Sequence, residues 1–580
     1  MSAALRSRAA VVVAALVALV TLLAGCAGIP ASGPPQEFTD DGGQTTAPEG
    51  PDLRYDAIQP QPGEPPLEIV KDFIAVGGSH EDQHAGARAY LTPAAAKSWK
   101  DAAGVVAIED SPVYLRPEKG GAEIVMSAQK RGRLDADGAY HPDGSSLTHR
   151  FHLEKVAGEW RIADPPAGVL VYVSTFQRAW RQYSVFFLNS TRTQVVPDVR
   201  LVPYPQENAL PSLLVGDLAA GPSTALQGAV RSDLEGVRLQ SNVVRDKDRV
   251  RVYLTGLGGS TDTLEDGGFA QLLWTLYPLG VGGVEVFLDN KPVAPRNAPD
   301  KTLQRFGDWA TYDPEDIGVS TPGYFVRNGT VRTTADRPVP GPAGIGAYAA
   351  ASVGVSVDQR SMAVVGRRAD GVGLYVGRVG GPLRLNLTAR SLTAPTWGSA
   401  VDEVWTVKDG KEIVLVQASG ATSRVTAADL DRVGPLWSLR LSRDGARVAV
   451  VAGPPGGQRL FVGIIVRQNG APRIDGLRVV DVGAGPVSDV SWSDALTLAV
   501  LVRAREENSA LYTVSIDGRA SGQPVAAAGL SGPPSGVAAA PHLPLLVVAG
   551  RAVWSSPGSG EPWSRVTSQA ADDSAPAYPG

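Results

Sequence analysis

Cysteine is almost absent from this sequence, because Cys26 is the only one among 580 residues. No disulfide can form within the chain, and the segments after Cys26 hold no cysteine that could act as a nucleophile. The stability of the folded part must therefore come from packing alone.

Blocks of basic residues are also absent. The formal net charge is −5, with 54 Lys and Arg residues against 59 Asp and Glu residues. Proteins that bind nucleic acid neutralise phosphates with clustered basic side chains. We therefore expect no nucleic-acid partner.

Long apolar runs are limited to one, at the N-terminus. It covers residues 9–24, which is 16 residues, whereas a membrane-spanning helix needs roughly 20. No segment after Cys26 is apolar enough to span a bilayer. The run fits the apolar part of a secretory signal better than an uncleaved membrane anchor.

The residues around this run complete the signal. Arg6 and Arg8 precede it, and the motif Leu22-Leu23-Ala24-Gly25-Cys26 ends it. This motif resembles the lipobox of bacterial lipoproteins. The resemblance implies a signal peptide over residues 1–25, a diacylglycerol and palmitate anchor on Cys26, and a mature chain that begins at Cys26. A plain secretory signal with a chance cysteine is the alternative.

A lipid anchor at Cys26 also predicts where the chain is located. Two or more acyl chains hold a protein stably on a membrane, whereas one chain does so only marginally. We expect a chain anchored to the cell membrane through Cys26, with all later residues on the extracytoplasmic face.

Residues 26–64 are predicted to be a disordered tether. Prolines interrupt the segment repeatedly and few large apolar side chains are present, so it cannot bury enough surface to fold. A flexible chain of this length spans on the order of 35 Å on average. The folded part can thus stand clear of the lipid headgroups.

The remainder is expected to be mainly β and divided into several domains. The length suggests three or four domains. The sequence has 66 glycines and 45 prolines, which points to many turns, and valine is plentiful.

Residues 65–170 are predicted to form an α+β domain. Apolar residues recur at helical spacing from Leu67 to Ile74, before a glycine pair. Ser79 is expected to cap a second helix that runs toward Leu91. Strand-like runs follow as far as Ile162. Two helices followed by strands resemble the NTF2-like or cystatin-like fold, which assigns no activity by itself.

Residues 180–297 are predicted to form the next domain. The expected elements, in order, are strands at 183–188 and 195–202, a helix at 210–218, a strand at 250–254, a helix at 269–276 and a strand at 284–288. This order, with a Gly-Pro stop after the first helix, resembles the GerMN domain of spore-germination and envelope proteins. The resemblance implies an interaction or structural role without catalytic residues.

Residues 310–575 contain a repeat typical of a β-propeller. Equivalent positions at Val355, Trp397, Leu441, Trp492 and Ala539 are 42, 44, 51 and 47 residues apart. A period of about 45 residues with four short strands fits one propeller blade. The five copies predict five blades, and the hairpin at 325–331 either closes the ring or contributes to a sixth. The Ser-x-Asp-Gly turns resemble those of TolB-type propellers.

Several residues in the propeller have alternative interpretations. Its tryptophans, which include Trp397, Trp405 and Trp437, are expected mainly to pack between blades, although some could line a binding surface. Acidic turn residues such as Asp358 and Asp444 could approach a cation on the axis. We expect no cofactor and assign no metal ligand.

One enzymatic motif has to be weighed. The segment from His80 to His84 matches His-Glu-x-x-His, which on a helix places two histidines one turn apart for zinc, with Glu81 as base. The glycine pair before it puts the motif at a helix start, where acidic residues are favoured by the dipole. We therefore expect a solvated first turn, and keep a zinc hydrolase at His80/His84, or a hydrolase on the propeller, as the alternative.

The lipobox, tether, NTF2-like segment, GerMN domain and propeller, in this order, resemble the LpqB family of actinobacterial lipoproteins over nearly all of the mature chain. The resemblance implies an accessory that binds the extracellular domain of an MtrB-like sensor histidine kinase. In that role the family affects MtrAB signalling, cell-envelope homeostasis and division. We therefore expect a binding protein rather than an enzyme, with no catalytic residue to transfer.

Overall fold

The structure is a computed structural model. It describes residues 59–79, 84–115, 122–203, 209–256, 264–315, 317–468, 471–483, 485–503, 509–519, 522–556, 562–567 and 572–580. The predicted signal peptide, Cys26 and most of the predicted tether lie outside these residues. The described part is mainly β, as predicted, and no helix in it is long and apolar enough to cross a membrane.

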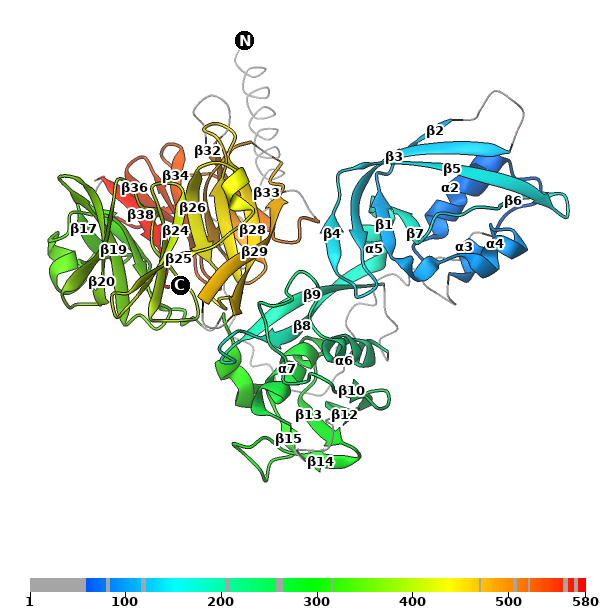
Figure 1. Ribbon diagram of the computed structural model, residues 1–580, viewed down its shortest axis with the longest axis horizontal. Helices are drawn as coiled ribbons and strands as arrows, with labels where there is room; N and C mark the ends of the chain where they lie inside the picture. Colours follow the sequence, from blue (N-terminus) through cyan, green and yellow to red (C-terminus); the bar gives the residue numbers. More distant parts are fainter. Residues whose placement is uncertain are drawn as a thin grey trace, which may run out of the picture. The chain divides into compact units, whose positions relative to one another are not determined.

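The first domain, called here the N-terminal domain, packs helices against one curved sheet (Figure 1). Helix α2 forms where the apolar residues at helical spacing predict it, and its face with Ile69, Val70 and Phe73 is buried. The sheet has the strand order β6-β5-β3-β1-β7, with β2 and β4 paired to β3. The bounds are α2 Pro66–Val76, α3 Ala85–Arg88, α4 Pro93–Ser98, β1 Val105–Ile108, β2 Val113–Leu115, β3 Glu123–Leu134, β4 Tyr140–Pro142, β5 Ser146–Val156, β6 Glu159–Ile162, β7 Val169–Tyr172 and α5 Val173–Ala179.

The second predicted helix of this domain is wrong in its start. Helix α3 begins at Ala85 rather than after Ser79. His84 precedes it with φ 58°, a left-handed conformation that a residue inside a right-handed helix cannot have. A helix capped by Ser79 therefore does not run through His84.

The middle domain contains the elements β8 to β15. A parallel pair, β12 and β13, lies at the centre of its main sheet, and α7 forms the connection between them. Apolar side chains of β8, α6 and α7 meet those of this pair in one core. The bounds are β8 Trp180–Leu188, β9 Val195–Pro203, α6 Leu210–Ala220, β10 Arg238–Leu239, β11 Val244–Asp246, β12 Arg249–Thr255, α7 Asp266–Leu276, β13 Gly283–Leu288, β14 Lys291–Val293 and β15 Leu303–Gln304.

The C-terminal domain is a β-propeller with five four-stranded sheets and one three-stranded sheet in the described residues. The first three four-stranded sheets are β18 Ala350–Val355, β19 Ser361–Arg368, β20 Gly371–Arg378 and β21 Leu383–Ala389; β22 Thr396–Trp397, β23 Glu403–Lys408, β24 Glu412–Gln417 and β25 Thr422–Val425; and β26 Leu436–Leu441, β27 Arg447–Ala452, β28 Arg459–Gln468 and β29 Ala471–Val480. The other two are β30 Val487–Trp492, β31 Thr497–Arg503, β32 Ser509–Ser515 and β33 Gln523–Pro524; and β34 Pro534–Ala538, β35 Leu545–Ala549, β36 Ala552–Ser556 and β37 Ser564–Arg565.

The three-stranded sheet closes the ring. Strands β16 (Tyr324–Arg327) and β17 (Thr330–Thr333) form the hairpin seen in the sequence, and β16 pairs with the last strand β38 (Asp573–Ala577). Figure 1 shows the red C-terminal strands beside the green first sheets. The innermost strands β18, β22, β26, β30, β34 and β38 contact one another in turn, and β38 returns to β18. The hairpin thus contributes to a sixth sheet, one of the two alternatives left by the sequence.

Apolar clusters between neighbouring sheets hold the ring together. Trp397 lies among side chains of the β18 and β22 sheets, and Trp405 among those of the β22 and β26 sheets. Both are fully buried, as expected for packing between blades. Trp437 is the exception, because 45% of its surface is exposed.

Candidate functional site

The residues singled out in the sequence do not gather at one site. Cys26, His80 and Glu81 lie outside the described residues. His84 is only 6% exposed, its Nδ1 lies 2.7 Å from the Ser79 carbonyl oxygen, and its ring lies 6.0 Å from that of Trp99. The expected solvated turn is therefore wrong for His84, because its ring packs against Trp99.

The position of His84 also argues against a zinc site at His80/His84. The motif needs two histidines on one face of a continuous helix, and His84 comes before helix α3 rather than inside a helix. In the described part of the chain, no three His, Cys, Asp or Glu residues are placed to hold a metal ion.

The acidic propeller turns are held by their own hydrogen bonds. Asp358 accepts from Ser356 Oγ at 2.6 Å and from the Arg360 amide at 3.1 Å. Asp444 accepts from Ser442 Oγ at 2.5 Å and from the Ala446 amide at 2.8 Å. These donors satisfy the carboxylates in the way a turn requires, so the geometry does not support a cation on the axis at either residue.

The two turns differ in their surroundings. Asp358 is exposed, whereas Asp444 is 1% exposed because the turn from Ser442 to Arg447 lies against the middle domain. Asn189 Nδ2 donates to the Asp444 carbonyl at 3.2 Å, and the Arg447 guanidinium donates to the Pro197 carbonyl. We call this contact the joint, defined by the turn 442–447 and by residues 189–200 of the middle domain.

Buried ion pairs lie on both sides of the joint. Arg447 Nη1 lies 3.4 Å from the Asp444 carboxylate, and Arg200 Nη1 lies 2.9 Å from that of Asp198. Burial lowers the pKa of Arg447, while Asp444 and Asp198 act in the opposite direction. Asp198 also accepts from the amide and the hydroxyl of Ser223. Charges taken this far out of water are stable only when they are paired, so the joint depends on its ion pairs.

Apolar packing extends the joint. Ala446 belongs to the same buried cluster as the core of the middle domain, and Ile464 of β28 packs against that cluster. Arg231 donates to the Arg467 carbonyl at 3.3 Å, and Arg467 itself forms a two-bond ion pair with Glu403. The middle domain and the propeller therefore share one core at this contact.

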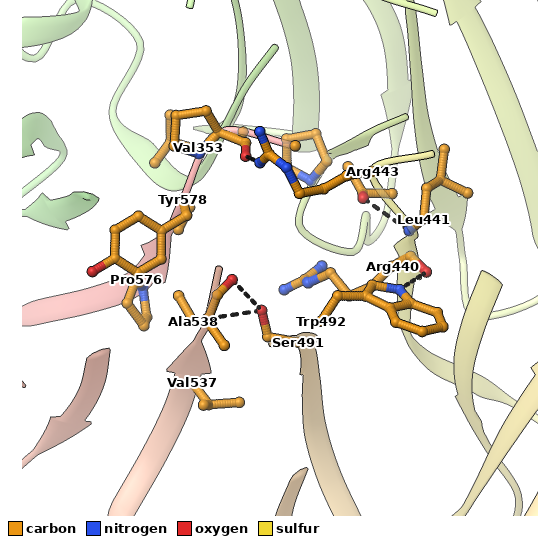
Figure 2. Close-up of a pocket in the computed structure, with 17 residues that line it drawn as sticks. Val353, Arg440, Leu441, Arg443, Ser491, Trp492, Val537, Ala538, Pro576 and Tyr578 are labelled. Carbon is orange, nitrogen blue, oxygen red and sulfur yellow. Dashed lines mark hydrogen bonds between the residues drawn. The ribbon is translucent and has the colours of Figure 1, made fainter. Parts of the chain in front are cut away.

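A small cavity lies on the propeller axis, at the carboxyl ends of the innermost strands. It encloses about 50 Å³, which is room for a few water molecules. Figure 2 shows Arg440, Ser491 and Trp492 around it, with Arg443 and Tyr578 on the other walls. Burial raises the pKa of the Tyr578 hydroxyl, which donates to the Pro544 carbonyl at 2.8 Å.

Comparison with protein families divides the chain in a similar way. A family described as "Lipoprotein LpqB, N-terminal domain" matches residues 59–177, one described as "Sporulation and spore germination" matches residues 184–294, and one described as "Lipoprotein LpqB beta-propeller domain" matches residues 323–579. The protein named Lipoprotein LpqB of Rhodococcus opacus is 30% identical over 551 residues, which cover 89% of this chain and 88% of that protein.

The chain belongs to the LpqB family of lipoproteins. The LpqB of Thermobifida fusca is 28% identical over 620 aligned positions, which cover 97% of each chain. Among solved structures, TolB from Acinetobacter baumannii aligns with a TM-score of 0.32 at 13% identity, covering 53% of this chain and 85% of TolB.

Two features of this LpqB-family chain escaped the sequence analysis. The joint turn 442–447 has the same Ser-x-Asp pattern as the exposed turn 356–361, so the pattern alone does not reveal the contact. Arg440, in contrast, could have been found from the sequence. It occupies the position where the other sequence repeats have Gly354, Thr396, Ser491 or Ala538, and comparing the repeats position by position would have found it.

Proposed function

We propose that this LpqB-family chain is an extracytoplasmic binding protein, tethered to the cell membrane, that acts as an accessory of a two-component sensor kinase. The proposed partner is the extracellular domain of an MtrB-like sensor, and the proposed effects are on cell-envelope homeostasis and division. Membership of the LpqB family over nearly the whole chain carries the proposal.

The proposed location rests on the N-terminal sequence. The lipobox ending at Cys26 supports a lipid anchor, and residues 26–64 supply a tether between that anchor and the folded domains. An anchored protein meets a membrane-embedded sensor at a high local concentration, so even a weak contact between the two would be occupied.

The joint supports a binding role for the folded part. Because the middle domain and the propeller share buried hydrogen bonds and apolar contacts, they offer a preformed surface. A preformed surface loses little conformational entropy when a partner binds. The axial cavity supports the same conclusion, since a space for a few waters is small for the substrate of a hydrolase.

Direct binding to the sensor tests the proposal. The mature chain carries Cys26→Ser, which removes the acylation site. It is titrated against the immobilised extracellular domain of the MtrB-like sensor kinase from the same organism. We expect saturable binding, and no binding to the extracellular domain of an unrelated sensor kinase used as the control.

Absence of saturable binding by a correctly folded chain would contradict the proposed partner. Folding is checked by circular dichroism and by a cooperative thermal transition. Equal binding to both extracellular domains would contradict the specificity of the proposal.

A further inference from the structure

The innermost strands of the propeller line the axial cavity with small residues, except for one long cationic side chain. Gly354, Thr396, Ser491, Ala538 and Ala577 line it from five of the six innermost strands, and Arg440 lines it from β26. Figure 2 shows the Arg440 guanidinium pointing into the open middle of the cavity. The small side chains around the axis leave the space that this guanidinium faces.

Arg440 does not link neighbouring sheets in the way that the small polar side chains do. At the equivalent positions, Thr396 Oγ1 accepts from the Leu441 amide at 3.1 Å, and Ser491 Oγ accepts from the Ala539 amide at 3.0 Å. Each hydroxyl thereby ties one sheet to the next. An arginine side chain has donors only and cannot replace such an acceptor. Arg440 reaches the preceding sheet through Nη1 alone, which donates to the Ala394 carbonyl just before β22.

One edge of the Arg440 guanidinium remains open. Nη1 donates to the carbonyls of Ala394 and Leu439 at 3.3 and 3.2 Å. In the part of the chain that the structure describes, no acceptor lies within hydrogen-bond distance of Nε or Nη2. This edge, with two parallel N–H donors, is the one that binds a carboxylate or a phosphate through two hydrogen bonds.

The carboxylate nearest to Arg440 is engaged elsewhere. Asp489 Oδ1 lies 3.8 Å from Arg440 Nη2, beyond hydrogen-bond distance. Asp489 accepts instead from Ser438 Oγ at 3.1 Å, from the Val490 amide at 2.9 Å and from the Val537 amide at 3.3 Å. It lowers the cost of burying Arg440 without occupying its open edge.

A second guanidinium faces the same space. Arg443 lines the cavity and donates to the backbone carbonyls of Pro314 and Pro579. Two arginines on one small cavity favour an anion in it, because their charge exceeds that of the nearby Asp489 carboxylate. The Arg440 side chain is 18% exposed, so solvent and a small ligand can reach it.

We propose that the axial cavity of the propeller is a binding site for a single oxyanion group, held by the Nε/Nη2 edge of Arg440. The cavity volume of about 50 Å³ leaves room for only a small group, such as one phosphate or one carboxylate. The oxyanion is either a free anion or the carboxylate of an acidic side chain inserted by a protein partner.

Calorimetric titration tests the site. The mature chain with Cys26→Ser is titrated at constant ionic strength with inorganic phosphate and, separately, with a short peptide that carries one glutamate and blocked termini. We expect saturable binding of at least one probe. Binding of phosphate alone assigns a free anion, and binding of the peptide assigns a partner's carboxylate.

Substitutions at Arg440 make the test specific. Arg440→Gln should weaken binding about tenfold or more, because charge-assisted double hydrogen bonds are lost. Arg440→Lys keeps the charge but not the two-donor edge, and should bind more weakly than wild type but more tightly than Arg440→Gln. Arg424→Gln, an exposed arginine on β25, is the matched control and should bind like wild type.

Two results would overturn the proposal. One is that wild-type chain binds neither probe, which would leave Arg440 simply hydrated. The other is binding that Arg440→Gln and Arg424→Gln weaken equally. If Arg440→Gln does not fold, the comparison of wild type with Arg440→Lys decides, since equal affinities would contradict the two-donor geometry.

Discussion

The joint between the middle domain and the propeller gives the sharpest structural prediction, because the chain supplies its own control. Asp444 and Asp358 occupy the same position in Ser-x-Asp turns and accept the same types of hydrogen bond. Only Asp444 also faces a buried arginine, with Arg447 Nη1 at 3.4 Å. Asp444→Asn and Asp358→Asn therefore differ mainly in the loss of this ion pair.

The size of the destabilisation expected for Asp444→Asn follows from the burial of Asp444 and Arg447. The Asp444 side chain is fully buried and that of Arg447 nearly so. Removing one partner of such a pair leaves an uncompensated buried charge and costs about 3–5 kcal/mol. Asp358→Asn should cost about 1 kcal/mol or less, because it changes only hydrogen bonds in an exposed turn.

Hydrogen exchange is the suitable assay, because a multi-domain chain does not unfold in a single two-state step. Asp444→Asn should speed exchange of the amides of β9 and β27, the strands next to the joint, on the order of 10²-fold. The double variant Asp444→Asn/Arg447→Met should recover part of the protection, since it removes both buried charges together but also loses the hydrogen bond from Arg447 to the Pro197 carbonyl.

Two outcomes would refute this reasoning. Equal small effects of Asp444→Asn and Asp358→Asn would mean that the pair contributes nothing to the joint. A double variant no better protected than Asp444→Asn would mean that an unpaired Arg447 is not the cause of the loss.

Three further predictions concern the fold. Arg327→Met should clearly lower the melting temperature of the propeller, because Arg327 forms two hydrogen bonds, at 2.6 and 3.1 Å, with the buried Asp573 across the ring closure. Arg368→Met, at an exposed pair, should change this melting temperature little. Equal shifts of the two variants would contradict the role of the closure. Trp397→Ala should destabilise the propeller by about 3–5 kcal/mol, because it leaves a cavity between two sheets. Trp437→Ala, at an exposed site, should destabilise the propeller clearly less. A larger effect of Trp437→Ala would contradict the packing role of Trp397. Burial raises the pKa of Asp217 to about 6, so the folded chain binds this proton more tightly than the unfolded chain, and the ionised Asp217 destabilises the fold as the pH rises through 6. Asp217→Asn should therefore raise the melting temperature at neutral pH and change it little at pH 4. An equal shift of the melting temperature at both pH values would contradict this linkage.

Much of the architecture could be predicted because the local signals and the tertiary structure agree. The apolar residues at helical spacing from Leu67 to Ile74 form the buried face of α2. The repeat spacing in the propeller identified the innermost strands, since each blade needs the same short strands to bury both faces of its sheet. The hairpin predicted at residues 325–331 likewise marked the first strands of the closing sheet.

Other features could not be predicted, because contacts distant in sequence decide them. A serine followed by acidic residues predicts a helix cap, but helix α3 begins only at Ala85, and the ring of His84 before it lies 6.0 Å from that of Trp99. The glycine of the joint turn, Gly445, does not reveal the joint either, because the atoms that a side chain there would meet belong to the propeller itself. Gly445 has φ 72°, and a Cβ there would lie 2.3 Å from Ser399 Oγ, so this position admits only glycine without a shift of Ser399.

The central claim is that the chain modulates a sensor kinase from a lipid anchor, and the most direct measurement is phosphorylation of the sensor's response regulator in cells. We predict that deletion of the chain changes this phosphorylation, that the wild-type chain restores it, and that the Cys26→Ser chain, expressed at the same level, does not. Unchanged phosphorylation in the deletion strain would contradict the regulatory role, and full restoration by Cys26→Ser would contradict the need for the anchor.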